Sequence, residues 1–340
     1  MYLLRSCFIF STVSTIIGGL TLQSNVILGH MNDKKIVITG VNGFVGEHLS
    51  RHLRDLGFHI IGIGREEKLN GPIASLIDTY YRVDMFKSEE FADVDLQNVQ
   101  AIIHLAGLAS VADSFKNPDL YKTGNAIITE NLLKLAKSQN FKGRIVVISS
   151  GALYDPNQPM PIIEESSVIE NSPYAVGKIA AEKVSIDYKN NGLDVVIVRP
   201  FNHIGPGQGT GFLLPDLYAQ IEQAKKNGDK TISVGNLNSK REFTDVLDIV
   251  VAYGLLATAE SLNHEIYILS SGASHSGQEI LDYLKTATEW TGSAVIDESR
   301  IRPNDPADII GDSSRLKNEL GWNPSIPLEK TIQDFVDYNK

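Results

Sequence analysis

Short apolar runs alternate with longer stretches of helical spacing along most of the chain. The runs are rich in β-branched residues and short enough to be buried strands; they span residues 36–39, 59–63, 101–105, 144–149 and 195–199. After the first run, Leu49, Leu53 and Leu56 recur every three or four residues, as on one face of a helix. This alternation predicts an α/β fold with a doubly wound parallel sheet, whose ligands lie at the carboxyl ends of the strands.

A glycine-rich turn follows the first run directly and precedes the helical pattern at residues 47–56. A strand, a glycine turn and a helix in this order place a pyrophosphate against the helix N-terminus. Glycines there let the backbone approach the phosphates and let the helix pack on the sheet. We therefore predict a Rossmann-type dinucleotide site. The residues expected to bind the cofactor are Gly40, Asn42, Gly43, Phe44, Val45 and Gly46.

Tyr174 and Lys178 lie four residues apart, and so on one face of a predicted helix. A nearby ammonium favours the phenolate, which brings a tyrosine with an ordinary pKa of about 10 towards acid–base work at neutral pH. Ser150 ends a predicted strand and can hold a carbonyl or alcohol oxygen beside the phenol. This trio predicts proton transfer to oxygen while a nicotinamide exchanges hydride with carbon. The alternative is a surface pair on an amphipathic helix.

The alternation breaks after Arg199, where a glycine- and proline-rich loop spans residues 200–211. Residues 245–258 have the pattern of a helix that returns to the sheet. We predict that residues 31–200 and 243–270 form the dinucleotide-binding domain. Residues 201–242 and 271–340 are predicted to form a smaller lobe that binds the substrate.

Composition excludes several classes of function. The chain has 340 residues, and 41 acids against 31 bases give a formal charge of −10, which argues against a nucleic-acid or anionic-membrane surface. Its single cysteine, Cys7, excludes an intrachain disulfide framework and a multi-cysteine metal site. We expect no metal. A catalytic cysteine within the folded region is excluded as well.

Residues 1–30 differ from the rest, with one formal charge at Arg5 and an apolar-to-small stretch at residues 7–22. A secretory signal usually ends at a small-residue site such as Ala-x-Ala, yet no alanine precedes Ala74. A membrane anchor needs about 20 predominantly apolar residues, and serine, threonine and glycine dilute this stretch. Met31 stands just before the first strand. We favour a mis-set start and a cytoplasmic protein, with the secretory signal as runner-up and the anchor left open.

The tip of the second predicted strand bears on the choice of cofactor. It reads Gly62-Ile63-Gly64-Arg65, without the acid that often binds the adenosine ribose. An arginine at this place suits a 2′-phosphate, so NADP(H) is favoured and NAD(H) is the alternative. Arg65 can equally be an exposed loop residue.

Further residues near the strand ends complete the predicted cofactor site. Asp84 either accepts a hydrogen bond from the adenine amino group or serves a turn. Leu105, Ala106 and Gly107 stand at the end of the third strand, where the glycine leaves room for the cofactor. Asn125 is expected to steady the active-site backbone or a water. The preceding His104 is more easily explained as a structural residue than as a catalytic one.

Ser150 stands four residues before Tyr154, and Tyr174 and Lys178 follow. With the glycine turn, this arrangement resembles the extended short-chain dehydrogenase/reductase superfamily over residues 33–340. Asp155 replaces the glycine that usually follows that tyrosine, a mild departure. Three segments narrow the resemblance to the GDP-sugar reductases of that superfamily: RPFNHIGPGQ at 199–208, REFTDVLD at 241–248 and RPNDP at 302–306.

The resemblance implies a catalytic set of Ser150, Tyr174, Lys178 and Asn125. It implies that Tyr174, Lys178 and Pro200 also contact the cofactor. Its substrate set is Ser110, Ser150, Asn202, Arg241 and Arg302. Arginine offers a planar fork to phosphate oxygens, so Arg241 and Arg302 would clamp the diphosphate. Surface ion pairs with Asp245 and Asp305 are the alternative for these arginines.

The implied reaction is reduction of the C4 ketone of GDP-4-dehydro-6-deoxy-D-mannose, giving GDP-D-rhamnose or its C4 epimer. Gly151 and Ala152 follow Ser150, where a 4,6-dehydratase carries an acid. Cys7 lies outside the fold, which removes the cysteine that an epimerase-reductase of the GDP-fucose type uses. A nucleotide-sugar 4-epimerase with tightly bound NAD stays open. A non-catalytic nucleotide-binding protein would usually show a broken triad, and here the triad is intact. A homodimer through the helices bearing Asn125 and Tyr174 is also implied.

Overall fold

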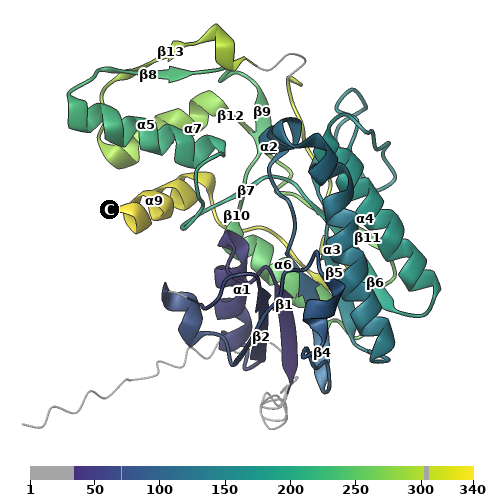
Figure 1. The fold of residues 1–340 in the computed structure, drawn as a ribbon. Helices are drawn as coiled ribbons and strands as arrows, with labels where there is room; N and C mark the ends of the chain where they lie inside the picture. Colours follow the sequence, from purple (N-terminus) through teal and green to yellow (C-terminus); the bar gives the residue numbers. More distant parts are fainter. Residues whose placement is uncertain (1–33, 70, 302–305) are drawn as a thin grey trace, which may run out of the picture.

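The computed structural model describes residues 34–69, 71–301 and 306–340 (Figure 1). The predictions for residues 1–30 and for Arg302 therefore lie outside the described residues. No helix within the described ranges is both long and apolar enough to cross a membrane.

Seven parallel strands form the central sheet and confirm the predicted fold class. Their order is β11-β6-β5-β4-β1-β2-β3, and every neighbouring pair runs in parallel. The five predicted runs all lie in it, and β3 and β11 were not predicted. The strands are β1 (Lys35–Thr39), β2 (His59–Gly64), β3 (Thr79–Arg82), β4 (Val99–His104), β5 (Arg144–Ile148), β6 (Asp194–Pro200) and β11 (Ile266–Leu269).

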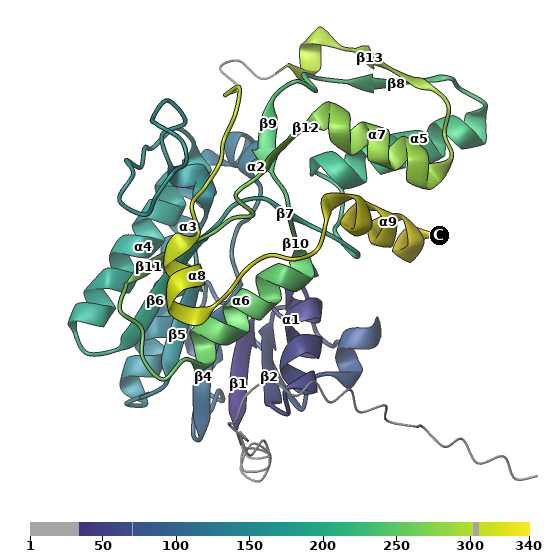
Figure 2. The same cartoon turned by 180° about the vertical axis from the view of Figure 1, so that it is seen from behind.

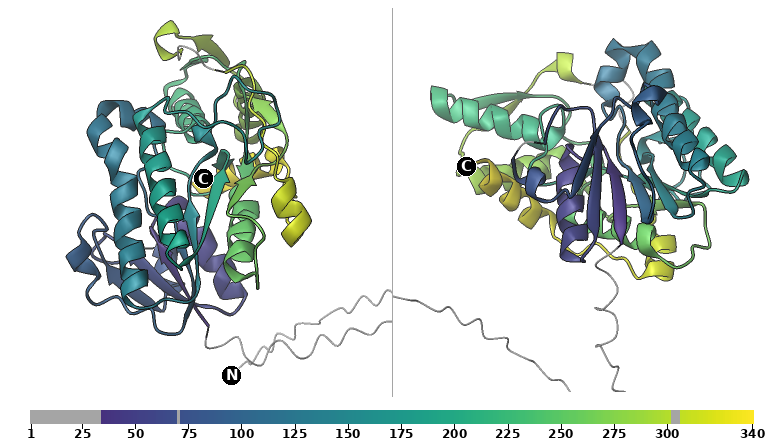
Figure 3. Two further views of the ribbon diagram at one scale, coloured as in Figure 1. Left: turned by 90° about the vertical axis from the view of Figure 1, so that its right-hand side faces the viewer. Right: turned by 60° about the horizontal axis from the view of Figure 1, so that its bottom comes forward.

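Helices cover both faces of this sheet, because side chains alternate along each buried strand. Ile36 and Ile38 face α1 (Phe44–Asp55) and α6 (Val246–Thr258), whereas Val37 belongs to the opposite cluster with α3 (Pro118–Ser138). α4 (Pro173–Asn190) packs along α3. Figure 3 shows the helices on the two faces.

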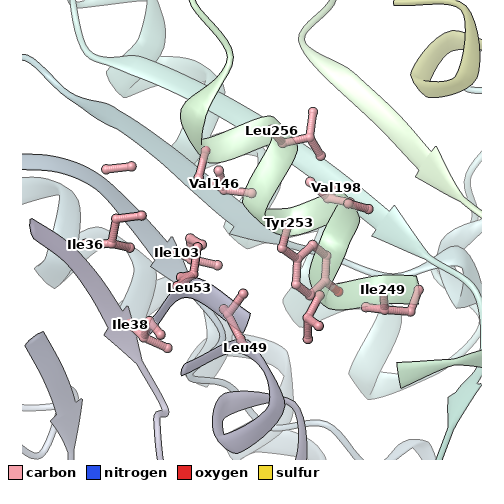
Figure 4. Packing of buried hydrophobic residues seen from close by; sticks show 14 of the residues in the cluster. Ile36, Ile38, Leu49, Leu53, Ile103, Val146, Val198, Ile249, Tyr253 and Leu256 are labelled. Carbon is pink, nitrogen blue, oxygen red and sulfur yellow. The ribbon is translucent and has the colours of Figure 1, made fainter. Parts of the chain in front are cut away.

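The cluster under α1 and α6 is the larger part of the core. Leu49 and Leu53 of α1 meet Ile249, Tyr253 and Leu256 of α6 over the strands (Figure 4). Tyr253 is only 1% exposed. The predicted helix at residues 245–258 thus returns to the sheet, as expected from its pattern.

A separate apolar cluster lies beyond the carboxyl ends of the strands (Figures 1 and 2). Leu214, Ile221, Leu284, Ile332 and Phe335 are among its buried members. We call this part the small lobe. It comprises α5 (Leu213–Asn227), β8 (Thr231–Val234), α7 (Gly277–Thr288), β13 (Ser293–Ile296) and α9 (Leu328–Asn339).

Two short strand pairs connect the small lobe to the sheet. β7 (His203–Ile204) pairs in parallel with β10 (Thr244–Asp245), and β9 (Lys240–Glu242) pairs antiparallel with β12 (Ser274–Ser276). The predicted domain boundaries stay a prediction. Within the segment assigned to the smaller lobe, Leu316 of α8 (Ser314–Leu320) and Trp322 pack into the cluster under α1 and α6.

The remaining elements are short. They are the helix α2 (Val111–Lys116) and the 3₁₀ turns η1 (Gly71–Ser75), η2 (Ser88–Phe91), η3 (Gly151–Leu153) and η4 (Glu298–Arg300).

Candidate active site

The structure brings Tyr174, Lys178 and Ser150 together at the end of β5. Ser172 caps α4 by accepting a hydrogen bond from the Ala175 amide at 3.1 Å, so Tyr174 enters in the first turn. Lys178 follows one turn later, and both side chains are more than nine-tenths buried. Ser150 lies two residues beyond β5, caps η3, and shares a hydrogen bond with Tyr174. These three side chains therefore form one cluster.

The charge state of this cluster is set by burial more than by the lysine. Burial raises the pKa of Tyr174, and the hydrogen bond with Ser150 lowers it less. The expectation that Lys178 would lower this pKa was wrong for this structure. The Lys178 ammonium instead donates to the Ile148 carbonyl at 2.8 Å, and burial lowers its own pKa to about 8.

Asn125 fixes the backbone beside the cluster. Its Oδ1 accepts from the Leu108 amide at 2.8 Å, and its Nδ2 donates to the Leu108 carbonyl at 3.2 Å. A Cβ on Gly107 would lie 3.0 Å from Asn125 Oδ1 and 3.4 Å from Lys178 Nζ. The loop after β4, which contains Leu105, Ala106 and Gly107, is thus held next to Lys178. Pro200 ends β6 two strands away, paired with Leu269.

The glycine turn has the shape that a pyrophosphate needs. Gly40 has φ +68°, and a Cβ there would lie 2.8 Å from the Ala106 backbone, so the turn closes against the loop after β4. At Gly46 a Cβ would lie 2.3 Å from the Val41 carbonyl oxygen, so the helix packs tightly on the turn. No side chain caps the first turn of α1 at Gly43. Its amide groups therefore suit a phosphate ligand.

Two further side chains of the turn fit a dinucleotide site. Asn42 Oδ1 is buried without a hydrogen-bond partner, although buried polar atoms normally have one. Phe44 opens α1 next to Val45 and stacks on His203, with ring centroids 6.2 Å apart and planes at 12°. The stack joins the glycine turn to β7, at the base of the small lobe.

Both an arginine and an acid stand beyond the end of β2. The Arg65 side chain is 85% exposed, and its Nε lies 3.6 Å from a carboxylate oxygen of Glu66. A Cβ on Gly64 would lie 3.2 Å from the other Glu66 oxygen and 2.7 Å from Asn42 Oδ1. Glu66 was not among the predicted residues, because an acid was expected at the strand tip and not two residues beyond it.

Asp84 serves a turn. Its Oδ1 accepts from the Phe86 amide at 3.2 Å, and its Oδ2 lies 3.8 Å from the Lys87 ammonium. These contacts agree with a turn role for Asp84. Its hydrogen bond with the adenine amino group stays a prediction.

Three of the predicted substrate residues lie before α2, between β6 and β7, and in β9. Ser110 caps α2, with its Oγ 3.1 Å from the Asp113 amide. Asn202 is exposed between β6 and β7. Arg241 lies in β9 and donates to the carbonyls of Lys240 at 2.6 Å and Pro306 at 2.8 Å. Arg302 and Asp305 fall outside the described residues.

Asp245 has a structural role at the start of α6. Its carboxylate accepts from the Leu247 amide at 2.7 Å and from the Thr331 hydroxyl at 2.6 Å. This acid therefore caps α6 and ties it to α9.

Comparisons with known proteins identify relatives along most of the chain. The family model described as GDP-mannose 4,6 dehydratase matches residues 37–335. GDP-6-deoxy-D-mannose reductase from Pseudomonas aeruginosa is 30% identical over 308 residues, which cover 89% of this chain and 96% of the relative. UDP-glucuronate 4-epimerase from Thermodesulfobacterium geofontis is 29% identical, with 89% and 95% covered.

Among solved structures, RMD from Pseudomonas aeruginosa complexed with NADPH superposes with a TM-score of 0.77. Its sequence is 29% identical, and the match covers 89% of this chain and 98% of that one. The first of these relatives is by its name a reductase of a GDP-linked sugar, and RMD carries NADPH in its solved structure. Both agree with an oxidoreductase that uses a nicotinamide dinucleotide.

Proposed function

Because the chain belongs to the GDP-mannose 4,6 dehydratase family, within the extended short-chain dehydrogenase/reductases, we propose that it is a nucleotide-sugar reductase. Its proposed substrate is GDP-4-dehydro-6-deoxy-D-mannose, reduced at C4 to GDP-D-rhamnose or the C4 epimer. The similarity to GDP-6-deoxy-D-mannose reductase supports this choice. We place the enzyme in the cytoplasm as part of the same proposal.

One observation carries the choice of a reductase over a dehydratase. Ser150 is followed by Gly151 and Ala152, so the acid expected of a dehydratase is missing at this place. The packing explains the glycine, because a Cβ at position 151 would lie 2.8 Å from the Phe201 ring. The site keeps its proton donor and lacks the group that would remove water.

The residues of the cluster suit proton donation to a ketone oxygen. Bound NAD(P)H would supply the hydride that adds to C4. Ser150 would hold the ketone oxygen, and Tyr174 would transfer its phenolic proton there, so that the C=O becomes a secondary alcohol. Burial raises the pKa of Tyr174, which keeps that proton on the phenol at neutral pH. A proton donor requires this protonation state.

A nucleotide-sugar 4-epimerase is the second candidate, favoured by the 29% identity to UDP-glucuronate 4-epimerase. It would use the same serine, tyrosine and lysine, but it would retain its cofactor as NAD between turnovers. Net consumption of reduced cofactor distinguishes the two functions.

For the cofactor we propose NADPH, with Arg65 facing the 2′-phosphate. The exposed guanidinium is close to a single acid, Glu66, which a phosphate would replace as its partner. Glu66 opposes this preference, because its carboxylate would repel the phosphate. The relative with NADPH bound supports the proposal.

The function is tested by incubating the protein with GDP-4-dehydro-6-deoxy-D-mannose and either NADPH or NADH. We expect oxidation of the cofactor and a GDP-6-deoxyhexose, identified by mass and by NMR of the sugar. The Tyr174→Phe variant should lose roughly a hundred- to ten-thousandfold in kcat, because it lacks the proton donor. Its cofactor affinity should stay close to that of the wild type. A wild-type protein that interconverts C4 epimers without consuming NAD(P)H would instead be an epimerase.

Cofactor preference gives a paired test at the end of β2. Arg65→Ala should weaken NADPH binding about tenfold more than NADH binding, since a charge-assisted bond to phosphate is lost. Glu66→Gln should act in the opposite direction and strengthen NADPH binding relative to NADH. Both dissociation constants are measured by calorimetry. Equal losses for the two cofactors in Arg65→Ala would contradict the assignment.

The diphosphate contact we propose for Arg241 has its own test. Arg241→Ala should raise KM for the nucleotide sugar more than tenfold, because a charge-assisted hydrogen bond contributes about 1.5–3 kcal/mol. Lys240→Ala, on the exposed neighbour in β9, is the matched control and should change KM little. If Arg241→Ala lowers only the melting temperature and leaves substrate affinity intact, Arg241 has a structural role and does not bind the diphosphate.

We further propose that the protein is a homodimer through α3 and α4. Of the apolar residues considered on α3, Leu132 is fully buried under the sheet and Leu135 packs against the same cluster, whereas Ile127 is 39% exposed. Ile127→Asp should therefore convert dimers to monomers in light scattering and leave the melting temperature nearly unchanged. A wild-type protein that is monomeric at the same concentration would refute the proposal.

A further inference from the structure

Glu182 is a buried carboxylate on the same face of α4 as Tyr174 and Lys178. The three residues follow one another at four-residue intervals, so their side chains form a stripe along the helix. Glu182 is 5% exposed, although an ionised carboxylate is costly to bury without partners. Neither the proposed hydride transfer nor the proposed proton transfer uses this acid.

Its partners come from the ends of two neighbouring strands. Arg199 of β6 donates to both Glu182 oxygens, from Nε at 2.8 Å and from Nη2 at 2.6 Å. The Ser149 hydroxyl, directly after β5, donates to the same carboxylate. Arg199 is itself buried, and its Nη1 donates to the Tyr154 hydroxyl at 2.9 Å. A single carboxylate thus binds α4 to the ends of β5 and β6.

We propose that Glu182 is a positioning residue for the reaction of the proposed function, on which this inference rests. Glu182 holds the Ser149–Ser150 segment against α4 and balances the charge of Arg199 next to Lys178. Two neighbouring contacts show how the Ser149–Ser150 segment is held against α4. Lys178 donates to the carbonyl of Ile148 at 2.8 Å, and Glu182 accepts from Ser149. The last residue of β5 and the residue after it are therefore held by consecutive turns of α4, and Ser150 comes next.

The negative charge of Glu182 also affects the protonation of Lys178. Burial lowers the pKa of Lys178 to about 8, and the carboxylate of Glu182 acts in the opposite direction. The side chain of Arg199 is 7% exposed, as is that of Glu182, so solvent screens their charges poorly. Neutralising Glu182 would remove the negative charge that raises the pKa of Lys178 and would leave the Arg199 cation without its carboxylate partner.

The other titratable groups near the cluster are neutral or already paired, so Glu182 is the group that balances the charge of Arg199. They are Tyr174 on α4, His104 on β4, Tyr121 on α3, Tyr253 on α6, Tyr154 after η3, and Glu164 in the loop that follows. The pKa of each of these tyrosines is raised, so all are neutral at pH 7. Burial lowers the pKa of His104 to about 3, which leaves it neutral too. Glu164 is paired with Arg315 at 3.3 Å.

Two single substitutions test the proposal because they should act in opposite directions. In Glu182→Gln the alkaline limb of the kcat–pH profile should move to lower pH by about one unit, since Lys178 loses its proton more readily. In Arg199→Met the unbalanced carboxylate should move the same limb to higher pH. The double variant should lie between the two. KM for the nucleotide sugar should change less than kcat at pH 8.

A matched control separates charge balance from loss of stability. Arg144 of β5 is also buried and pairs with Asp194 at 3.0 Å, at the opposite end of the strands. Asp194→Asn should lower the melting temperature without moving the pH profile. If Glu182→Gln and Arg199→Met also change only the melting temperature, the proposal is overturned.

A direct titration decides the question independently of turnover. The ¹³Cε resonance of Lys178, assigned by its loss in Lys178→Met, reports the protonation of this side chain in the full-length protein. We expect its midpoint below the wild-type value in Glu182→Gln and above it in Arg199→Met. Unchanged midpoints would refute the inference. A wild-type protein inactive on the GDP-sugar would instead refute the proposed function and leave this titration decisive.

Discussion

All seven strands of the sheet are parallel, and so they all end at the same edge. Residues far apart in the sequence meet there as a consequence: the glycine turn after β1, the loop after β4, Ser150 after β5 and Asn202 after β6. Parallel pairing requires crossover helices on the sheet faces, which places the first turns of α1 and α4 at this edge too. The residues proposed to bind the cofactor and to transfer the proton therefore converge at this edge because of the sheet topology alone.

Desolvation gives the side chains at this edge their acid–base properties. It acts on a phenol and an ammonium in opposite directions, raising the pKa of Tyr174 and lowering that of Lys178. A phenol that keeps its proton and an ammonium with a pKa of about 8 thus lie on the same helix face. The buried pair of Glu182 and Arg199 adds two opposite charges that nearly cancel. Such a pair contributes little to net stability, whereas breaking it leaves an uncompensated charge next to the site.

Features of the fold that depend on a short stretch of sequence were predicted correctly. The apolar runs became strands, and the turn at Gly40 became a tight approach to Ala106, because both follow from spacing and backbone freedom. The sequence did not predict β3, an edge strand with no fully buried residue, or β11, which follows the break in the alternation. Glu182 was missed because its importance comes from Arg199 and Ser149, which are distant in the chain, and Glu66 was missed because it stands two residues beyond the strand tip. The pKa of Tyr174 was predicted in the wrong direction, since a sequence shows the nearby lysine but not the burial.

The packing of Phe201 has a consequence for how this enzyme can change during evolution. Its ring lies between two glycines, with a Cβ at Gly151 reaching within 2.8 Å and a Cβ at Gly311 within 2.6 Å of ring atoms. A single substitution that puts an acid at position 151 would collide with that ring. A lineage moving towards elimination chemistry would first have to replace Phe201 and refill the space, at a cost in core packing. Gly151 is thus a steric barrier to placing an acid directly after Ser150.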